Sequence, residues 1–308
     1  METRAPVTHD FLGYNATVSK PPLSSQSNGV VRILPAAMTA ALFLALFGPP
    51  FISLAKDWWQ LPEAGHGLLL APAAVWLAWR SGIRDGAAPN HKLGAAILIL
   101  AILIRYTGGL AAEFFTTRES IVLALAGITV YHYGFRQILW WWLPFALAAL
   151  AVPLPELVTQ AVALPLQFKA SRIGATMLES RHVPVRLTGN IIRIPGRELF
   201  VTEACSGLRS LTALLSVGVL LGGVTLRYPV SRLLLLGLAI PIAVLINGIR
   251  VFLTGFLVYY VSPSLGEGFM HVTEGWLLFL VSFASLGLIA WVMVVGERRF
   301  AQRDHRND

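Results

Sequence analysis

Cysteine and charge are both scarce in this chain of 308 residues. It contains a single cysteine, Cys205, and charged residues make up only 13% of the sequence, against 56% for hydrophobic residues. One cysteine excludes an internal disulfide and any metal site built from several cysteines. The charged fraction is too small to cover a soluble globule of this size. The composition therefore predicts an integral membrane protein.

Several familiar catalytic and binding patterns are also missing. The sequence has no HExxH motif and its seven histidines do not cluster, which argues against a zinc protease. It has neither a GxSxG elbow nor a P-loop. Asp57 and Asp85 are the only aspartates outside the tails, and they fall on opposite sides of the expected membrane. The net charge of +8 is scattered among loops, so we expect no nucleic-acid partner. Nothing points to a metal or another cofactor.

Apolar runs near the length of a bilayer crossing indicate an all-α polytopic protein with about eight transmembrane helices. We expect a disordered cytoplasmic tail over residues 1–32, a transmembrane domain over 33–296 and a basic cytoplasmic tail over 297–308. The expected spans are 33–54, 66–80, 93–112, 119–134, 137–152, 204–226, 231–260 and 272–296.

The distribution of lysine and arginine predicts the orientation. Most basic residues outside the spans fall in segments assigned to one side, whereas the short loops of the other side carry only Lys56 and Arg118. Because basic loops stay in the cytoplasm, we expect both termini there. Six further basic residues lie in the long segment 153–203, whose length weakens the rule.

The segment 153–203 differs from the rest of the chain. Its opening prolines, in VPLPELV, end the fifth span, and an amphipathic stretch then continues to about residue 180, along the outer membrane surface. Val183, Val185 and Leu187 next alternate with polar residues, and the turn signals TGN and PG flank IIRI. We predict a small antiparallel sheet or a pair of hairpins over 183–202, outside the membrane. Its edge is suited to an extended peptide.

The topology brings three distant residues to one depth. Cys205 begins a helix that enters from the outer side, and His271 begins the last span on that same side. Arg250 follows cytoplasmic Ser231 by nineteen residues, which at about 1.5 Å per residue is nearly a full crossing. We therefore expect a thiol, a guanidinium and an imidazole near the outer surface.

These three groups suit acyl transfer through a thioester. A neighbouring cation and a helix N-terminus lower the pKa of a thiol, which makes Cys205 a candidate nucleophile. His271 is the candidate general acid and base, and Arg250 the candidate for stabilising an oxyanion. The alternatives stay open: Cys205 as a small packed residue and His271 as an interfacial histidine. An arginine inside a span is costly and usually functional.

Four further residues are candidates for a supporting role. Arg209 lies one turn after Cys205 and either stabilises the thiolate, pairs with Glu203 or locks helices together. Glu203 and Asn247 are candidates for orienting the arginine and the histidine, although Asn247 equally fits a hydrogen bond between packed helices. His66 either lines the same cleft or caps the second span.

The motifs TEACSGLRSL, NGIRV and His271 followed by EGW resemble the three signature regions of the exosortase/archaeosortase family of membrane cysteine transpeptidases. The stretches EAGHGLLLAP, WWLPFALAALAVPLPE and VPVRLTGNIIRIPG are similar to the upstream regions of that family. The resemblance covers about residues 60–285. By it, Cys205 matches the nucleophile, Arg250 the essential arginine and His271 the histidine of the bacterial branch.

The resemblance implies a substrate and a location. Such a protein cleaves exported proteins at a C-terminal sorting signal, made of a short motif such as PEP, a transmembrane helix and a basic cluster. Exopolysaccharide or a lipid-linked molecule is then a candidate acceptor. The expected location is the bacterial inner membrane, with the active site facing the periplasm and in contact with lipid. The alternative class is a non-enzymatic transporter or assembly factor for polysaccharide export.

Overall fold

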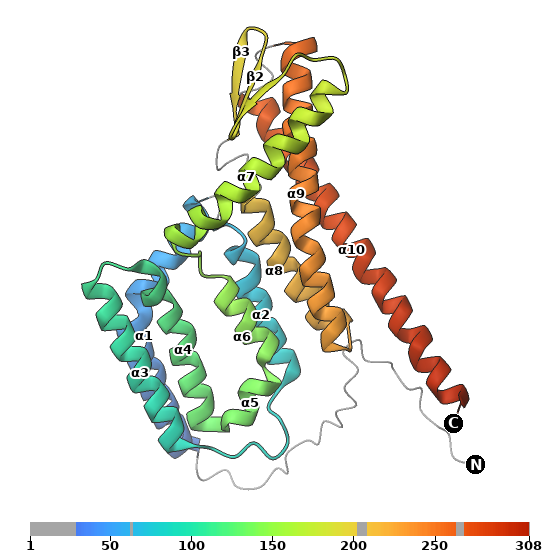
Figure 1. The fold of residues 1–308 in the computed structure, drawn as a ribbon. Helices are drawn as coiled ribbons and strands as arrows, with labels where there is room; N and C mark the ends of the chain where they lie inside the picture. Colours follow the sequence, from blue (N-terminus) through green and yellow to red (C-terminus); the bar gives the residue numbers. More distant parts are fainter. Residues whose placement is uncertain (1–28, 62–63, 202–207, 263–267, 308) are drawn as a thin grey trace. The chain divides into compact units, whose positions relative to one another are not determined.

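The computed structural model describes residues 29–61, 64–201, 208–262 and 268–307, and it is mostly helical with one small sheet (Figure 1). The chain forms two compact units, Met1–Pro153 and Leu154–Asp308. They are called the N-terminal and the C-terminal unit below. Residues 1–28, most of the predicted N-terminal tail, lie outside the described residues.

The N-terminal unit consists of helices. Their bounds are α1 Gly29–Gln60, α2 Gly67–Ser81, α3 His91–Leu110, α4 Phe114–Tyr133, α5 Phe135–Trp140 and α6 Trp142–Leu150. Helices α3 and α4 form an antiparallel hairpin with close backbone approach: a Cβ atom at Gly94 would lie 2.5 Å from the backbone of Tyr131. Small residues allow such approach between helices in a membrane.

The predicted fifth span over 137–152 is not one helix. The chain breaks at Trp141, between α5 and α6. Pro144 lies in the first turn of α6 and has no backbone N–H to donate to the carbonyl of Trp140, so a continuous helix would lose a hydrogen bond here. The break also lets the indole N–H groups of Trp140 and Trp141 donate to the carbonyls of Ser81 and Gly82 at the end of α2.

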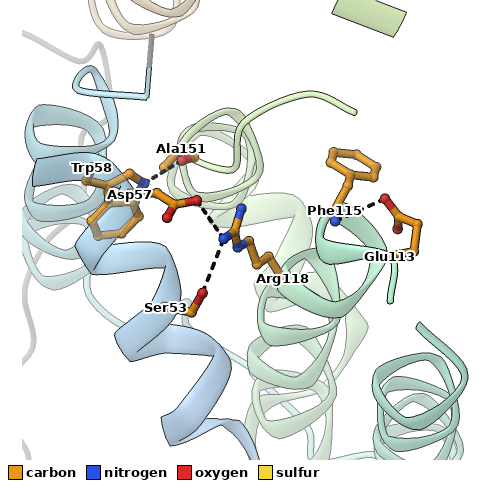
Figure 2. A network of polar contacts seen from close by, with 7 residues as sticks. All are labelled: Ser53, Asp57, Trp58, Glu113, Phe115, Arg118 and Ala151. Atoms are coloured by element: carbon orange, nitrogen blue, oxygen red, sulfur yellow. Dashed lines mark hydrogen bonds and ion pairs between the residues drawn. The ribbon is translucent and has the colours of Figure 1, made fainter. Parts of the chain in front are cut away.

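Buried polar contacts tie the helix ends of the N-terminal unit together (Figure 2). Arg118 on α4 is 9% exposed and forms an ion pair of 2.6 Å with Asp57 on α1. It also donates to the hydroxyl of Ser53 at 3.2 Å. Trp58 donates its indole N–H to the carbonyl of Ala151 at 2.7 Å. The assignment of Arg118 to a short loop was wrong, because α4 begins at Phe114 and takes in this arginine.

The described part of the C-terminal unit combines helices with the sheet (Figure 1). Its elements are α7 Glu156–Glu179, β1 Arg186–Thr188, β2 Ile191–Ile194, β3 Arg197–Phe200, α8 Leu208–Thr225, α9 Pro229–Tyr260 and α10 Gly268–Asn307. Helices α7 and α9 run in the same direction side by side. A Cβ at Gly248 would lie 2.5 Å from Ile173, and one at Gly255 would lie 2.8 Å from Leu178.

The three strands form an antiparallel sheet in the order β1-β2-β3, which confirms the predicted β element. Gly189 has φ of 62° at the first position of the two-residue turn between β1 and β2, as a type II′ turn requires. Gly196 has φ of 81° and follows Pro195, the order that favours a type II turn between β2 and β3. The signals TGN and PG therefore predicted both turns.

Five of the described helices contain segments long and apolar enough to cross a bilayer. These segments are Ala37–Gln60, His91–Leu110, Phe114–Tyr133, Pro229–Tyr260 and Leu277–Phe300. The predicted span 66–80 is the 15-residue helix α2, and within the predicted span 204–226 the apolar helix described runs from Leu211 to Thr225. The expected polytopic helical protein is thus confirmed, and the count of eight spans is not.

Candidate active site

Two apolar clusters divide the C-terminal unit along α9. The helix cluster joins α7, α8, α9 and α10, whereas the sheet cluster joins α7, the sheet and the second half of α9. Members of the helix cluster include Ala163, Leu211, Leu214, Leu235, Ala239, Ala243 and Leu286. Members of the sheet cluster include Ala170, Leu178, Val183, Ile192, Ile194, Val201, Val251 and Val258. Apolar side chains thus pack against one face of α9 on both sides of one boundary.

Polar side chains occupy that boundary. On α9, Asn247 is 5% exposed and lies between Ala243 of the helix cluster and Val251 of the sheet cluster. On α7, Gln167 is 6% exposed, and it likewise lies between members of the two clusters. Arg250 follows Asn247 by three residues, close to one helical turn, and its Nε atom is buried. These three residues, Asn247, Gln167 and Arg250, are called the polar layer below.

Ser171 is a further buried polar residue of α7, next to Ala170 of the sheet cluster. It is fully buried on α7, and its hydroxyl makes no hydrogen bond to any residue that the structure describes. Buried polar groups are normally hydrogen-bonded, so a cluster of them inside an apolar unit has a structural or functional cause. The sequence gives little sign of Gln167 or Ser171, because α7 looks there like the polar side of an amphipathic helix.

Val201 is the last described residue before Cys205. It is hydrogen-bonded to Asn190, which in turn contacts Gln167. Asn190 accepts a hydrogen bond from the backbone N–H of Val201 at 3.0 Å and donates its side-chain N–H to the carbonyl of Val201 at 3.1 Å. The same Nδ2 lies 3.2 Å from Oε1 of Gln167. The chain therefore leaves the sheet from a fixed point beside the polar layer.

Two of the predicted site residues, Asn247 and Arg250, lie three residues apart on α9. Cys205 and Glu203 lie outside the described residues. Arg209 belongs to α8 and His271 to α10, but their side chains are not among those that the structure describes. The coincidence of Cys205, Arg250 and His271 stays a prediction.

His66 belongs to the N-terminal unit and makes a different contact from those predicted. It precedes α2 and makes no capping bond with its side chain. Its Nε2 atom lies 3.1 Å from the carbonyl oxygen of Leu150, which can only accept, so Nε2 is the donor. Together with the bond from Trp58 to Ala151, this contact fixes the end of α6.

Metal ligands do not gather in the described part of the chain, where no three histidine, cysteine, aspartate or glutamate residues are grouped to hold an ion. The polar residues buried in the C-terminal unit offer amides, a hydroxyl and a guanidinium, which are groups that position a substrate or stabilise an oxyanion.

Comparison with protein families gives a match to the model described as transmembrane exosortase, over residues 58–288. The chain belongs to the transmembrane exosortase family. The matched range covers part of each unit and all of the exosortase motifs noted in the sequence, from EAGHGLLLAP to EGW. No match was found among curated proteins or among solved structures.

Proposed function

We propose that this exosortase is a membrane cysteine peptidase and transpeptidase that cleaves C-terminal sorting signals of exported proteins through a thioester on Cys205. Membership of the family supports an exosortase in the membrane. The residue assignment is ours: Cys205 is the nucleophile, Arg250 stabilises the oxyanion or the thiolate, and His271 is the general acid and base.

The observation that carries the proposal is the polar layer on α9. Arg250 and buried Asn247 follow the helix cluster along α9, and Arg250 lies about 29 Å along the helix from Ser231 in its first turn. Placing a guanidinium here is costly unless the position has a use. The segment that carries Cys205 follows Val201, which is a member of the sheet cluster.

The chemistry follows from the three side chains. His271 takes the proton of the Cys205 thiol, and the thiolate attacks the carbonyl carbon of the scissile peptide bond. Arg250 stabilises the negative charge on the carbonyl oxygen of the tetrahedral intermediate. The C–N bond then breaks, His271 returns the proton to the leaving amine, and the substrate remains as a thioester on Cys205. Water or an acceptor nucleophile cleaves the thioester and regenerates the thiol.

Four residues are proposed to support the three. Glu203 and Arg209 flank Cys205 in sequence. Arg209 stabilises the Cys205 thiolate, and Glu203 orients the neighbouring cations. Asn247 orients Arg250 from the preceding helical turn. For His66, its bond to Leu150 supports a role in fixing the N-terminal unit and not in the chemistry.

The proposed setting is the inner membrane of a bacterium. Both termini lie in the cytoplasm and the site opens to the periplasm, where exported substrates present the motif beside their membrane anchor. Membrane lipid surrounds the helices, and exopolysaccharide or a lipid-linked molecule is the proposed acceptor.

Processing of a sorting-signal protein by cells or proteoliposomes containing the full chain tests the proposal. Cys205→Ala is expected to abolish cleavage while the protein stays folded in the membrane. Ser216→Ala is the matched control, because it makes a similarly small change on α8, where the Ser216 hydroxyl only bonds the carbonyl of Thr212. Normal processing by Cys205→Ala would refute the enzyme and favour a transporter or assembly factor.

A further inference from the structure

We propose that Asn190 and Gln167 are positioning residues for catalysis, which hold the chain at its entry to the Cys205 segment. The inference rests on the proposed function and adds two residues to it. Neither side chain belongs to the signature motifs around Cys205, Arg250 and His271. Asn190, however, bonds Val201, four residues before the cysteine, and Gln167 accepts from the same side-chain nitrogen of Asn190.

Asn190 does more than form a turn. The register of β2 and β3 ends with the pair Ile191 and Phe200, so Asn190 and Val201 form the next pair of the ladder. The backbone N–H of Val201 donates to Asn190, and the Asn190 side chain supplies the second bond of the pair, to the carbonyl of Val201. Both backbone polar groups of Val201 are therefore held by one residue.

Gln167 connects this pair to the helices. Its Oε1 accepts from Asn190 Nδ2, and its side chain is almost fully buried on α7. Helix α7 packs closely along α9, where a Cβ at Gly174 would lie 2.5 Å from Val251, the residue after Arg250. The contacts thus run from the helix that carries Arg250, through α7, to the start of the Cys205 segment.

The short distance along the chain from Val201 to Cys205 links the position of the one to that of the other. Four residues span at most about 14 Å, so Cys205 cannot lie farther than that from Val201. On the other side, α8 begins at Leu208, three residues after Cys205. Fixing Val201 therefore limits where the Cys205 thiol can lie relative to Arg250. Productive geometry for nucleophilic attack tolerates little displacement.

The test uses two variants of the full-length protein in proteoliposomes. Asn190→Asp keeps the shape of the side chain but removes both N–H donors, and Gln167→Met keeps its length but removes the acceptor. The matched control is Arg193→Gln, which breaks an exposed ion pair with Glu198 in the same sheet. Thermal unfolding of each variant confirms that it folds.

Two readouts separate positioning from folding. For cleavage of a sorting-signal substrate, Asn190→Asp is expected to lower kcat about tenfold or more with KM nearly unchanged, because a displaced thiol attacks bound substrate less often in productive geometry. Alkylation by iodoacetamide reports only on Cys205, because the chain has no other cysteine. If Val201 is no longer held, the pH profile of the alkylation rate should shift by roughly one pH unit toward higher pH, because the Cys205 thiolate loses its cationic neighbour.

Gln167→Met should act in the same direction, and the double variant should lose no more than the larger single loss, since both residues belong to one set of contacts. The proposal is overturned if a folded Asn190→Asp protein shows wild-type kcat and a wild-type alkylation profile, or if Arg193→Gln has the same effect. Failure of the proposed function looks different. Cys205→Ala would then still process substrate, while alkylation of Cys205 in the wild type and in Asn190→Asp would continue to report on the contacts of Asn190 and Gln167.

Discussion

The two units bury polar groups in different ways. In the N-terminal unit, buried Arg118 pairs with Asp57, Trp58 bonds the end of α6, and Glu113 accepts from the first N–H groups of α4 (Figure 2). In the C-terminal unit, buried amides and a guanidinium lie between two apolar clusters, beside the chain that leads to Cys205. Polar contacts join helix ends in the first unit, whereas buried polar side chains lie along the packed helices α7 and α9 in the second.

This difference separates two uses of an arginine in a membrane helix. Arg118 has an acid partner on a neighbouring helix, so a structural role accounts for it. Arg250 lies within the motif NGIRV, one turn after a buried asparagine and within the family match. Substitutions in the two units should therefore affect different measurements: stability in the N-terminal unit, and chemistry in the C-terminal unit.

The largest expected effect is on catalysis by Arg250→Lys. A lysine keeps the charge but not the planar set of N–H donors, so the rate of substrate processing should fall about 100-fold or more. Arg118→Lys is the control in the other unit, since a lysine can still pair with Asp57. Its processing rate per folded molecule should stay near wild type. Equal losses in both variants would remove the distinction between the units.

Asp57→Ala should produce the largest loss of stability. Removing the carboxylate leaves Arg118 buried without its ion pair, which costs about 3–5 kcal/mol of unfolding free energy. The exposed pair of Arg193 and Glu198, with side chains 44% and 46% exposed, should contribute about 1 kcal/mol or less. Denaturation in detergent, with Arg193→Ala as the control, measures both. A stability loss for Asp57→Ala no larger than that of the control would contradict the structural role.

Gly248→Ala tests the close packing of α7 on α9. The new methyl group would lie 2.5 Å from Ile173, so the two helices must separate, at a cost of about 1–3 kcal/mol. Gly237→Ala is the control on the same helix, because a Cβ there meets nothing within 4 Å. It should leave stability unchanged or raise it slightly. Substrate processing should slow only in Gly248→Ala, because separating α9 from α7 moves Arg250, which lies on α9, away from α7.

Glu113 should give the smallest effect, and one that depends on pH. Hydrogen bonds from the Thr116 side chain and backbone, followed by the backbone of Phe115 and the charge of Arg118, hold the pKa of its carboxylate below the ordinary value of 4.5. The stability from this cap is therefore complete above about pH 4.5 and is lost as the pH falls through the lower pKa of the folded state.

Glu113→Ala should lose about 1 kcal/mol at neutral pH, as expected for a lost N-cap. Thermal unfolding of wild type and Glu113→Ala from pH 7 to pH 3 checks the sign, because their midpoints should converge as the pH falls. Divergence at low pH would mean that the carboxylate does not stabilise the helix.

The sequence allowed the helices and the sheet to be predicted because their signals are local. Long apolar runs gave α1, α3, α4, α9 and α10, and the pairs formed by Gly189 with Asn190 and by Pro195 with Gly196 specified the two turns. The break at Trp141 was missed because the run 137–152 is apolar throughout, and only the missing N–H of Pro144 opposes a continuous helix.

The candidate site was predictable only in part. Arg250 and Asn247 stand out as polar residues within an apolar run, and both belong to α9. Gln167, Ser171 and Asn190 do not stand out, because a polar residue on an amphipathic helix or in a turn is ordinarily exposed. Their burial comes from the packing of α7 on α9 and of the sheet on both, which no local pattern specifies.

Mass spectrometry of an acyl-enzyme tests the central claim most directly. Acid quenching of the protein during cleavage of a sorting-signal substrate should preserve a thioester, because acid protonates the attacking nucleophiles. If Cys205 forms the thioester, the peptide containing Cys205 should gain the mass of the N-terminal substrate fragment, and hydroxylamine should remove that fragment. Cys205→Ala should form neither adduct nor product. An adduct on another residue, or product formed by Cys205→Ala, would contradict the account.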